Sequence, residues 1–517
     1  MAISFNEIPL NIRVPGVYSE YDSSQAVTGS GVQPFNGILI GLKNEEVSNN
    51  DGTPLGTLAD DALHVIPSAK HAAEYWGAGS LLHRQAIAWF ANNRSTPVYG
   101  IATSIDTTAG RASRSLQIEA AQTTISSARL YIAGELILFG GTGPDPATTA
   151  VKCAEDLRTK INARPDLPVR AEISPVQTDT VVVRAKFKGA VGDQIDIRET
   201  LYVDDVQAPG LTFAATGGPG RLTGGTGDPP AIATTFGKIV DRNYNMWVFP
   251  FADSTSKKAL DGELKLRSEP TQQNDGMAFF ASDMKYTDLV ALNATYNSKY
   301  LTHICFPGPK SSDAAGTGSP TPAWELSAAY AAQAAQSLSI DPARPLQTLP
   351  LVGIKAHATA RWSWENNNGL LGKGISPTYV DGGGNVRLWR AVTMYTTSAL
   401  GVDDTAYLNV NTVFTLAYIR WSVRRRLGLK FPRYKLANDG TRFGRGQAVV
   451  TPKIIKSEIV ALFGEWENIG IVENADNFVE DLIVERNTSD PDRVDVKMPP
   501  DLVNQLRVTA IQIQFIV

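Results

Sequence analysis

The stretch NMWVFPF (residues 245–251) decides the fold class. It is short and almost wholly apolar, which is typical of a strand buried on both faces of a sheet. A helical stretch over about 256–267 follows, and MAFFAS (277–282) is a second strand of the same kind. The alternation continues with a helix over 286–297 and the strand THICFPG (302–308). Repeated strand–helix alternation predicts an α/β fold with a doubly wound, mostly parallel core sheet.

The same alternation extends in both directions from this centre. Upstream lie a helix over about 230–241, the strands GILIGL (37–42) and VYGIA (98–102), and a helix from Ser80 to Asn92. Downstream, TPAWELSAAYAAQAAQSL (321–338) predicts an Ala-rich helix with Thr321 as N-cap and Pro322 in its first turn. These segments assign residues 26–102 and 228–400 to one α/β core.

Between the two core segments the composition shifts toward Thr, Gly and β-branched residues. SARLYIAGELILFGG (127–141) predicts a hairpin that turns near Ala133 and Gly134, and a helix is expected over about 148–162. The Gly-rich run GGPGRLTGGTGDPP (217–230) resembles a linker back to the core. Residues 103–227 are therefore predicted to be an inserted β-rich domain.

The rest of the chain is predicted to form an α+β C-terminal domain over 401–505 and two extended arms. Its first element is a long helix capped by Asp403 or Asp404 and ending at Gly428. The N-terminal arm (1–25) alternates apolar residues with residues that include Pro9 and Pro15. Both prolines fall on one edge of an extended strand, so only the opposite edge keeps its donors. The predicted pairing residues are Ile8, Leu10, Ile12 and Val14.

The sequence of the C-terminal arm, LRVTAIQIQFIV (506–517), predicts an apolar strand prone to association, whose apolar face changes side near Ala510. The first half is expected to lie on its own domain and the second half to pair with a neighbouring copy. The residues assigned to that pairing are Ile511, Ile513, Phe515 and Val517.

Composition places the chain among soluble globular proteins. Hydrophobic residues make up 43% and charged residues 19% of 517 residues, with a net charge of -4. This balance gives no general attraction to nucleic acid or to an anionic membrane. The two cysteines, Cys153 and Cys305, form no CxxC pair, which favours folding in a reducing compartment. The N-terminal residues lack the pattern of a secretory signal, and no apolar run predicts membrane insertion.

The sequence carries no recognisable catalytic or cofactor motif. GLLGKGIS (369–376) lacks the glycine spacing and the Ser or Thr of a phosphate loop, and no GxSxG elbow is present. Five isolated histidines give neither a triad context nor a zinc pattern, and His303 is interpreted as a satisfied core residue. We therefore expect no enzyme activity, no metal and no cofactor, with a hydrolase of unrecognised site as the alternative.

Charge is unevenly distributed in the last hundred residues. Residues 411–460 hold eleven Lys and Arg against two acids, and residues 461–505 hold eleven acids against three basic residues. These blocks either neutralise each other inside one domain or meet between copies or on a partner, and RWSVRRRLG (420–428) allows a third reading, DNA contact. The candidate contact residues are Arg424, Arg425, Arg426, Lys430, Arg433, Glu465, Glu467 and Glu473.

The order of four stretches resembles the contractile tail sheath proteins of bacteriophages, most closely the Mu-like type. They are RVPGVYSEYD (13–22), LPVRAEISPVQTDTVVVRAKFKGAVGDQIDIR (167–198), FGKIVDRNYNMWVFPFAD (236–253), and NNNGLLGKGISP (366–377) followed by VRLWRAVTMYT (386–396). The resemblance covers nearly the whole chain. One departure is YSEYD, where the family commonly has a second acid directly after the Tyr-x pair.

The resemblance implies a mechanical role. Subunits of this family form hexameric rings stacked helically around a tail tube, and contraction drives the tube through the host envelope. It implies a subtilisin-like core without a triad, arms that add strands to neighbouring C-terminal domains, an insert on the outer surface and a C-terminal domain near the tube. The implied partners are further copies of the chain, the tube protein, and baseplate and tail terminator proteins. Nucleic acid and membrane are not among them. The implied location is the virion, after assembly in the host cytoplasm. Sheaths of R-type bacteriocins and secretion systems share this fold and are the alternative.

Overall fold

The computed structural model describes residues 33–45, 56–215, 217–227, 232–239, 242–251, 253–308, 318–444 and 446–516. The described residues divide into two compact units. Residues 34–417 and 505–516 form the large unit, and residues 418–504 with Gln33 form the small unit. The predicted arm residues Ile8, Leu10, Ile12, Val14 and Val517 lie outside the described residues.

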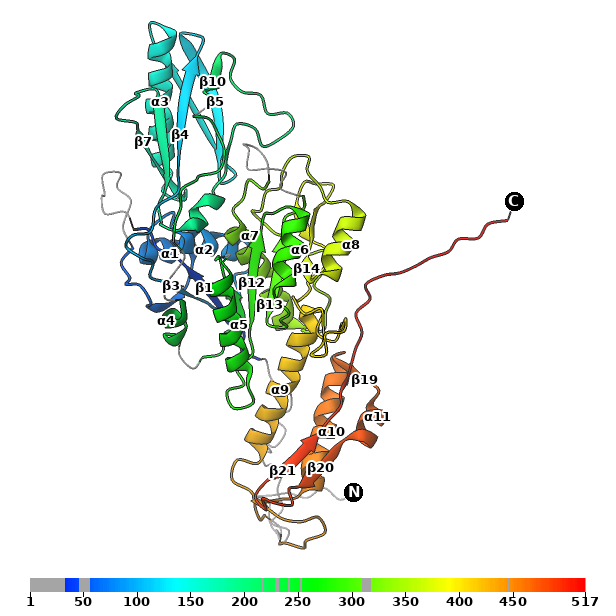
Figure 1. Cartoon of the computed structure of the whole chain (residues 1–517). Coiled ribbons are helices and arrows are strands. Elements are labelled where there is room, and N and C mark those ends of the chain that lie inside the picture. Colours follow the sequence, from blue (N-terminus) through cyan, green and yellow to red (C-terminus); the bar gives the residue numbers. More distant parts are fainter. Residues whose placement is uncertain are drawn as a thin grey trace, which may run out of the picture. The chain divides into compact units, whose positions relative to one another are not determined.

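A seven-stranded sheet is the centre of the large unit (Figure 1). All neighbouring strands run parallel except β2, which pairs antiparallel with β3. This confirms the prediction of an α/β fold with a mostly parallel sheet. The strand order is β14 (Ile375–Ser376), β13 (Leu301–Cys305), β12 (Met277–Ser282), β11 (Met246–Val248), β1 (Gly37–Gly41), β3 (Val98–Ala102) and β2 (Leu63–Ile66).

Both faces of this sheet are covered, which explains why its strands are apolar at successive positions. Met246 and Val248 belong to the same hydrophobic cluster as buried residues of α1, α2 and α7. Trp247 belongs to the opposite cluster, together with Phe236 of α4 and Leu260 of α5. The helices concerned are α1 (Ala69–Trp76), α2 (Leu81–Asn92), α4 (Ile232–Gly237), α5 (Ser254–Ser268) and α7 (Ala323–Ile340).

Two glycines let helices approach this sheet closely. A Cβ on Gly37 would lie 2.4 Å from the Trp89 ring, and a Cβ on Gly100 would lie 2.4 Å from the Trp76 ring. Both indole rings are fully buried. Glycine therefore stands where a large aromatic side chain lies directly on the strand backbone.

Residues after β3 form two small antiparallel sheets that pack on one long helix. The predicted hairpin is confirmed as β5 (Thr124–Ile132) and β6 (Glu135–Thr142), joined by Ala133 and Gly134, which both have positive φ. Two positive φ values match the right-handed twist of a two-residue hairpin. The remaining elements are β4 (Ser113–Ala120), α3 (Pro146–Asn162), β7 (Val169–Ile173), β8 (Thr180–Ala185), a 3-10 helix (Ala190–Gln194), β9 (Ile197–Arg198) and β10 (Leu211–Phe213).

The large unit also contains α6 (Tyr286–Ala294), α8 (Trp364–Gly372), and the hairpin of β15 (Thr378–Val380) and β16 (Val386–Leu388). The long helix α9 (Val410–Lys430) begins in the large unit and ends in the small one. The other elements of the small unit are β17 (Lys435–Leu436), β18 (Val449–Val450), α10 (Pro452–Asn468), β19 (Val472–Glu473), α11 (Ala475–Asp481), β20 (Ile483–Arg486), β21 (Val494–Lys497) and β22 (Asp501–Leu502).

Two predicted helix starts were wrong. Helix α9 begins at Val410, because the Asp404 carboxylate accepts hydrogen bonds from the Tyr395 hydroxyl and the Ala406 amide in a turn before the helix. It continues past Gly428 to Lys430, two residues before Pro432. Helix α7 begins at Ala323 with Pro322 as its cap, since the Thr321 hydroxyl bonds to the Lys355 backbone instead.

Candidate functional site

The C-terminal arm is held to the large unit at its root. The Gln505 side chain donates to the Ala343 carbonyl at 3.2 Å, and the Arg507 guanidinium donates to the Gln347 Oε1 atom at 2.9 Å. The Gln347 side chain also donates to the Leu506 carbonyl at 3.5 Å. Polar side chains and backbone therefore fix the start of the arm.

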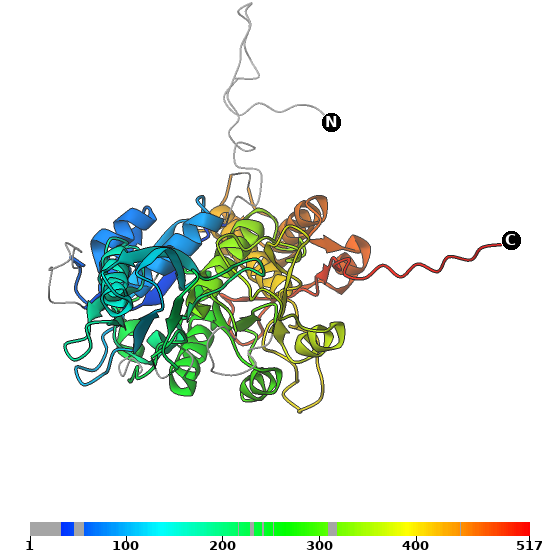
Figure 2. The ribbon, with the colours of Figure 1, turned by 90° about the horizontal axis from the view of Figure 1, so that it is seen from above.

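Beyond this root the arm is an exposed, extended segment (Figures 1 and 2). Ile511, Ile513 and Phe515 are 78%, 84% and 82% exposed, and residues 503–516 belong to no strand. Leu506 and Val508 are also exposed, so the first half is not held by the apolar face that the sequence predicted. The hydrogen bonds that fix the arm are made by residues 505–507, a few residues before the predicted change near Ala510.

Three of the predicted charged residues are paired inside the small unit. The Arg426 guanidinium, on α9, forms ion pairs with Glu465 and with Glu458 of α10, the latter at 3.7 Å. Lys430 pairs with Glu458 at 2.7 Å. The Arg426–Glu465 pair joins the basic block to the acidic block within one domain, as one of the readings expected. The pairs with Glu458 lie within the basic block itself.

The other charged candidates are distributed over several elements of the small unit. The Arg425 guanidinium lies 5.3 Å from the Trp421 ring centroid, a cation–π contact on α9. Arg424, Arg433, Glu467 and Glu473 are exposed. A contact of these residues with a neighbouring copy or with a tube protein stays a prediction.

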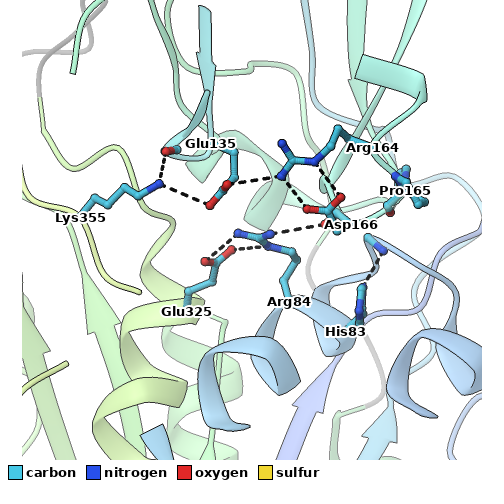
Figure 3. Close-up of polar contacts among 11 residues, drawn as sticks. His83, Arg84, Glu135, Arg164, Pro165, Asp166, Glu325 and Lys355 are labelled. Atoms are coloured by element: carbon cyan, nitrogen blue, oxygen red, sulfur yellow. Dashed lines mark hydrogen bonds and ion pairs between the residues drawn. The ribbon is translucent and has the colours of Figure 1, made fainter. Parts of the chain in front are cut away.

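A buried ion pair, which the sequence did not predict, joins helices α2 and α7 (Figure 3). The Arg84 Nε atom lies 2.8 Å from Glu325 Oε1, and the Arg84 Nη2 atom lies 3.0 Å from Glu325 Oε2. Both residues are 5% exposed. Burial opposes the charge of Arg84, but the attraction of Glu325 outweighs it and keeps the pKa of Arg84 above its ordinary value.

The inserted segment approaches this ion pair with charges of its own (Figure 3). Glu135, at the start of β6, lies 3.4 Å from both the Lys355 ammonium and the Arg164 guanidinium. Arg164 also pairs with Asp166 at 2.8 Å, and the Asp166 carbonyl accepts from Arg84 at 3.5 Å. The network therefore links residues 135–166 to both core segments of the large unit.

Polar contacts at a second place join the segment between β3 and α4 to loops of the core. The Arg221 guanidinium pairs with the Asp283 carboxylate, which also accepts from the Ser319 amide. The Arg198 guanidinium donates to the Gly318 carbonyl at 3.2 Å. The insert and the core of the large unit are thus joined by charged side chains at two places.

The only sequence signal for the junction was a charge in an apolar setting. Arg84 stands in LLHRQAIAWF (81–90), and Glu325 is the only acid in the Ala-rich stretch 321–338. Sequence spacing cannot pair them, because they are 241 positions apart. Only the fold brings the two helices together.

His303 forms hydrogen bonds with a serine and an asparagine, a set of residues that also occurs in catalytic sites, but here the group is buried. Its ring nitrogens lie 2.8 Å from Asn293 Oδ1 and 2.9 Å from Ser282 Oγ. The His303 side chain is fully buried, and burial keeps its pKa well below its ordinary value. The structure confirms the interpretation of His303 as a satisfied core residue.

Within the described part of the chain, His, Cys, Asp and Glu side chains do not gather into a group of three or more suited to a metal ion. None of the described helices combines the length and the apolar character needed to span a bilayer.

Comparison with known proteins identifies the family. Residues 228–394 match the phage tail sheath protein central domain, and residues 402–516 match the phage tail sheath C-terminal domain. The Mu-like prophage FluMu tail sheath protein of Haemophilus influenzae is 35% identical over 516 residues, covering 100% of both chains.

Solved structures of sheath proteins are also similar to this chain. The sheath tail protein of Desulfitobacterium hafniense aligns with a TM-score of 0.47 and 10% identity, over 94% of this chain and 100% of that chain. The sheath tail protein of Listeria innocua aligns with a TM-score of 0.47 and 14% identity, over 92% of this chain and 93% of that chain.

The match to the FluMu protein runs from end to end, and both domain matches fall in the same order as in the predicted resemblance. The relative is a structural protein, in agreement with the expectation of no enzyme activity. The chain belongs to the Mu-like phage tail sheath proteins and is a contractile tail sheath subunit.

Proposed function

We propose that this chain polymerises as hexameric rings stacked helically around a tail tube, and that contraction of the stack drives the tube through the host envelope. The observation that carries the proposal is the C-terminal arm: its root is fixed at Gln505 and Arg507, and its apolar residues Ile511, Ile513 and Phe515 are exposed. An exposed segment this apolar marks an interaction surface, and another copy of the chain would bury it.

Strand addition is the mode of contact that suits this arm. Backbone hydrogen bonds would supply affinity, and alternate side chains would occupy pockets on the neighbour. Each net backbone bond contributes about 1 kcal/mol, and each buried Ile or Phe side chain about 1.5–3 kcal/mol. Arms from both ends of the chain, repeated around a ring, would keep copies linked while their compact units rotate.

The remaining parts receive roles that follow from the same proposal. Residues 26–102 and 228–400 form a doubly wound scaffold, and residues 103–227 form an inserted domain on the outer surface. Residues 401–505 form an α+β domain near the tube, where the exposed Arg424, Arg433, Glu467 and Glu473 contact a copy or the tube protein. Residues 1–25 and 506–517 are the arms.

The proposed partners are other copies of this chain, the tube protein, the baseplate and the tail terminator, without nucleic acid or membrane insertion. Assembly takes place in the host cytoplasm, and the assembled sheath is part of the virion.

Negative-stain electron microscopy of the purified full-length protein tests the proposal. We expect tubes or rings from the full chain and soluble, unassembled subunits after deletion of residues 506–517. Monodisperse monomers of the full chain would overturn the polymerisation proposal, and normal tubes from the truncated chain would overturn the role of the arm.

A further inference from the structure

An aromatic groove of about 510 Å³ lies beside the root of the C-terminal arm in the large unit. Three tryptophans line it: Trp362 is nearly buried, whereas Trp364 and Trp389 are 73% and 45% exposed. The Trp389 ring packs on Tyr379 with the centroids 4.4 Å apart, which holds the indole in place. Arg507 and Val508 of the arm root line the same groove. Two exposed indoles in one hollow form a surface suited to a partner rather than to water.

The groove carries positive charge without an acid. Its described lining includes Arg390 and Arg507, and no Asp or Glu. Arg390 donates to Asn409 Oδ1 at 2.8 Å, and Arg507 donates to the neutral oxygens of Gln347 and Asn411. The Arg507 Nε atom is buried and has no hydrogen-bond partner among the described residues. The site thus offers guanidinium donors to a ligand that brings carboxylates.

The pKa values agree with this charge excess. Burial lowers the pKa of Arg507 to about 10, and the nearby charge of Arg390 lowers it as well. Burial also lowers the pKa of Arg390. Two partly buried cations that repel each other gain stability when an anion comes between them.

We propose that this groove binds residues 18–22, YSEYD, of a second copy of the chain. The segment has two tyrosines for the exposed indoles and two carboxylates, Glu20 and Asp22, for the two guanidiniums. It lies within the N-terminal residues that the structure does not describe. The inference rests on the proposed function, because it requires that copies assemble.

This contact would link the two arms of different copies. Arg507 both lines the groove and fixes the root of the C-terminal arm through Gln347. An acidic segment bound to Arg507 would therefore bring the N-terminal arm of one subunit against the base of the C-terminal arm of the next. The groove would add a side-chain contact to the strand pairing proposed for the arms.

Photo-crosslinking with the full-length chain tests the inference. A photo-reactive amino acid replaces Ser19, chains labelled with ¹⁴N and ¹⁵N are mixed in equal amounts, and mass spectrometry locates the crosslinks before and after assembly. We expect crosslinks between ¹⁴N and ¹⁵N chains that join position 19 to residues 364–371 or 389–390. Crosslinks confined to one chain, or joining position 19 to other surfaces, would overturn the inference.

Two sets of substitutions identify the contact. The double substitution Arg390→Gln with Arg507→Gln should lower the yield of crosslinks between chains at least fivefold. Glu20→Gln with Asp22→Asn should have the same effect. The second pair leaves the groove unaltered and keeps the test valid if the first pair impairs folding. The matched control is Arg387→Gln, since Arg387 pairs with Asp381 outside this groove. A yield unchanged by the arm substitutions would overturn the inference. Electron microscopy of the same samples reports assembly separately, so that tubes without the crosslink contradict only this inference and missing tubes contradict the proposed function.

Discussion

Arg84 and Glu325 form a two-point ion pair between helices α2 and α7, although 241 positions separate them in the sequence. Both side chains are almost completely buried, and each helix packs on the central sheet. The pair lies where the insert approaches the core, with Asp166 and Glu135 close by (Figure 3). The ion pair and its neighbours therefore join residues 135–166 to helices α2 and α7 within the large unit.

Removing one partner of this pair should be costly, because it leaves the other charge buried without compensation. We expect Arg84→Met or Glu325→Leu alone to lower the free energy of unfolding by about 3–5 kcal/mol. The double substitution should be close to neutral, because no charge is left behind. Urea unfolding of the soluble subunit measures all three variants. Additive effects of the two single changes would show that the residues do not act as a pair.

His83 should make the subunit sensitive to acid. Burial and the neighbouring charge of Arg84 lower its pKa to about 4, against an ordinary value of 6.5. Between these pH values the unfolded chain binds a proton and the folded chain does not, so stability falls as the pH falls from 6.5 to 4. A pKa shift of this size corresponds to a loss of about 3 kcal/mol in the free energy of unfolding across this pH range.

The measurement is the pH dependence of urea unfolding for the native chain and for His83→Gln. The substitution should flatten the curve between pH 4 and 6.5, because glutamine does not titrate. His64→Gln serves as the control, since His64 is exposed. An equal acid sensitivity in His83→Gln would place its origin elsewhere in the protein.

Lys257 is a buried cation that should destabilise the folded state at neutral pH. Its ammonium lies 4.6 Å from the Phe280 ring centroid and has no hydrogen-bond partner among the described residues. Burial lowers its pKa from 10.5 to about 8. Between pH 8 and 10.5 the unfolded chain holds the proton on this side chain and the folded chain does not, so the free energy of unfolding should rise with pH in this window. Below pH 8 both states are protonated, and the whole destabilisation by the buried ammonium is present.

Replacing Lys257 by methionine keeps an unbranched side chain that is one heavy atom shorter and removes the charge. We expect Lys257→Met to raise the free energy of unfolding at pH 7 by about 1–3 kcal/mol, after the loss of the cation–π contact is subtracted. Urea unfolding at pH 7 and pH 10 provides the comparison, with exposed Lys258→Met as the control. A lower free energy of unfolding for Lys257→Met at pH 7 would show that the ammonium does not destabilise the folded state.

The exposed residues of the C-terminal arm should matter for assembly and not for folding. We expect Ile513→Asp and Phe515→Asp to abolish tubes while leaving the melting temperature of the free subunit unchanged, since both residues are exposed in it. Gln514→Asp, on the opposite side of an extended strand, is the matched control and should affect assembly less. Equal loss from all three variants would indicate a general effect of charge on the arm.

The sequence predicted the elements whose signal is local. The strands around Met246 and Met277 were evident from short apolar runs, and the hairpin turn from Ala133 and Gly134. The start of α9 was predicted too early, because Asp404 is a favourable cap by type but serves a turn before Val410. A side-chain oxygen can satisfy either a helix or a turn, and only the tertiary structure decides between them.

The features of the C-terminal arm were predicted only in part. The exposed apolar residues of the C-terminal arm were evident from their alternation, yet its fixation by Gln505 and Arg507 was not, because their partners Ala343 and Gln347 are far away in the sequence. Charge counts also could not tell that Arg426 pairs with Glu465 inside the small unit. Long-range pairs of this kind leave no pattern in a single sequence.

The most direct test of the central claim is a cryo-EM reconstruction of tubes assembled from the full-length protein. We predict rings of six subunits, with residues 511–516 of each subunit forming a strand hydrogen-bonded to another copy. A reconstruction in which residues 511–516 pack on their own subunit, or in which the rings are not hexameric, would contradict the account.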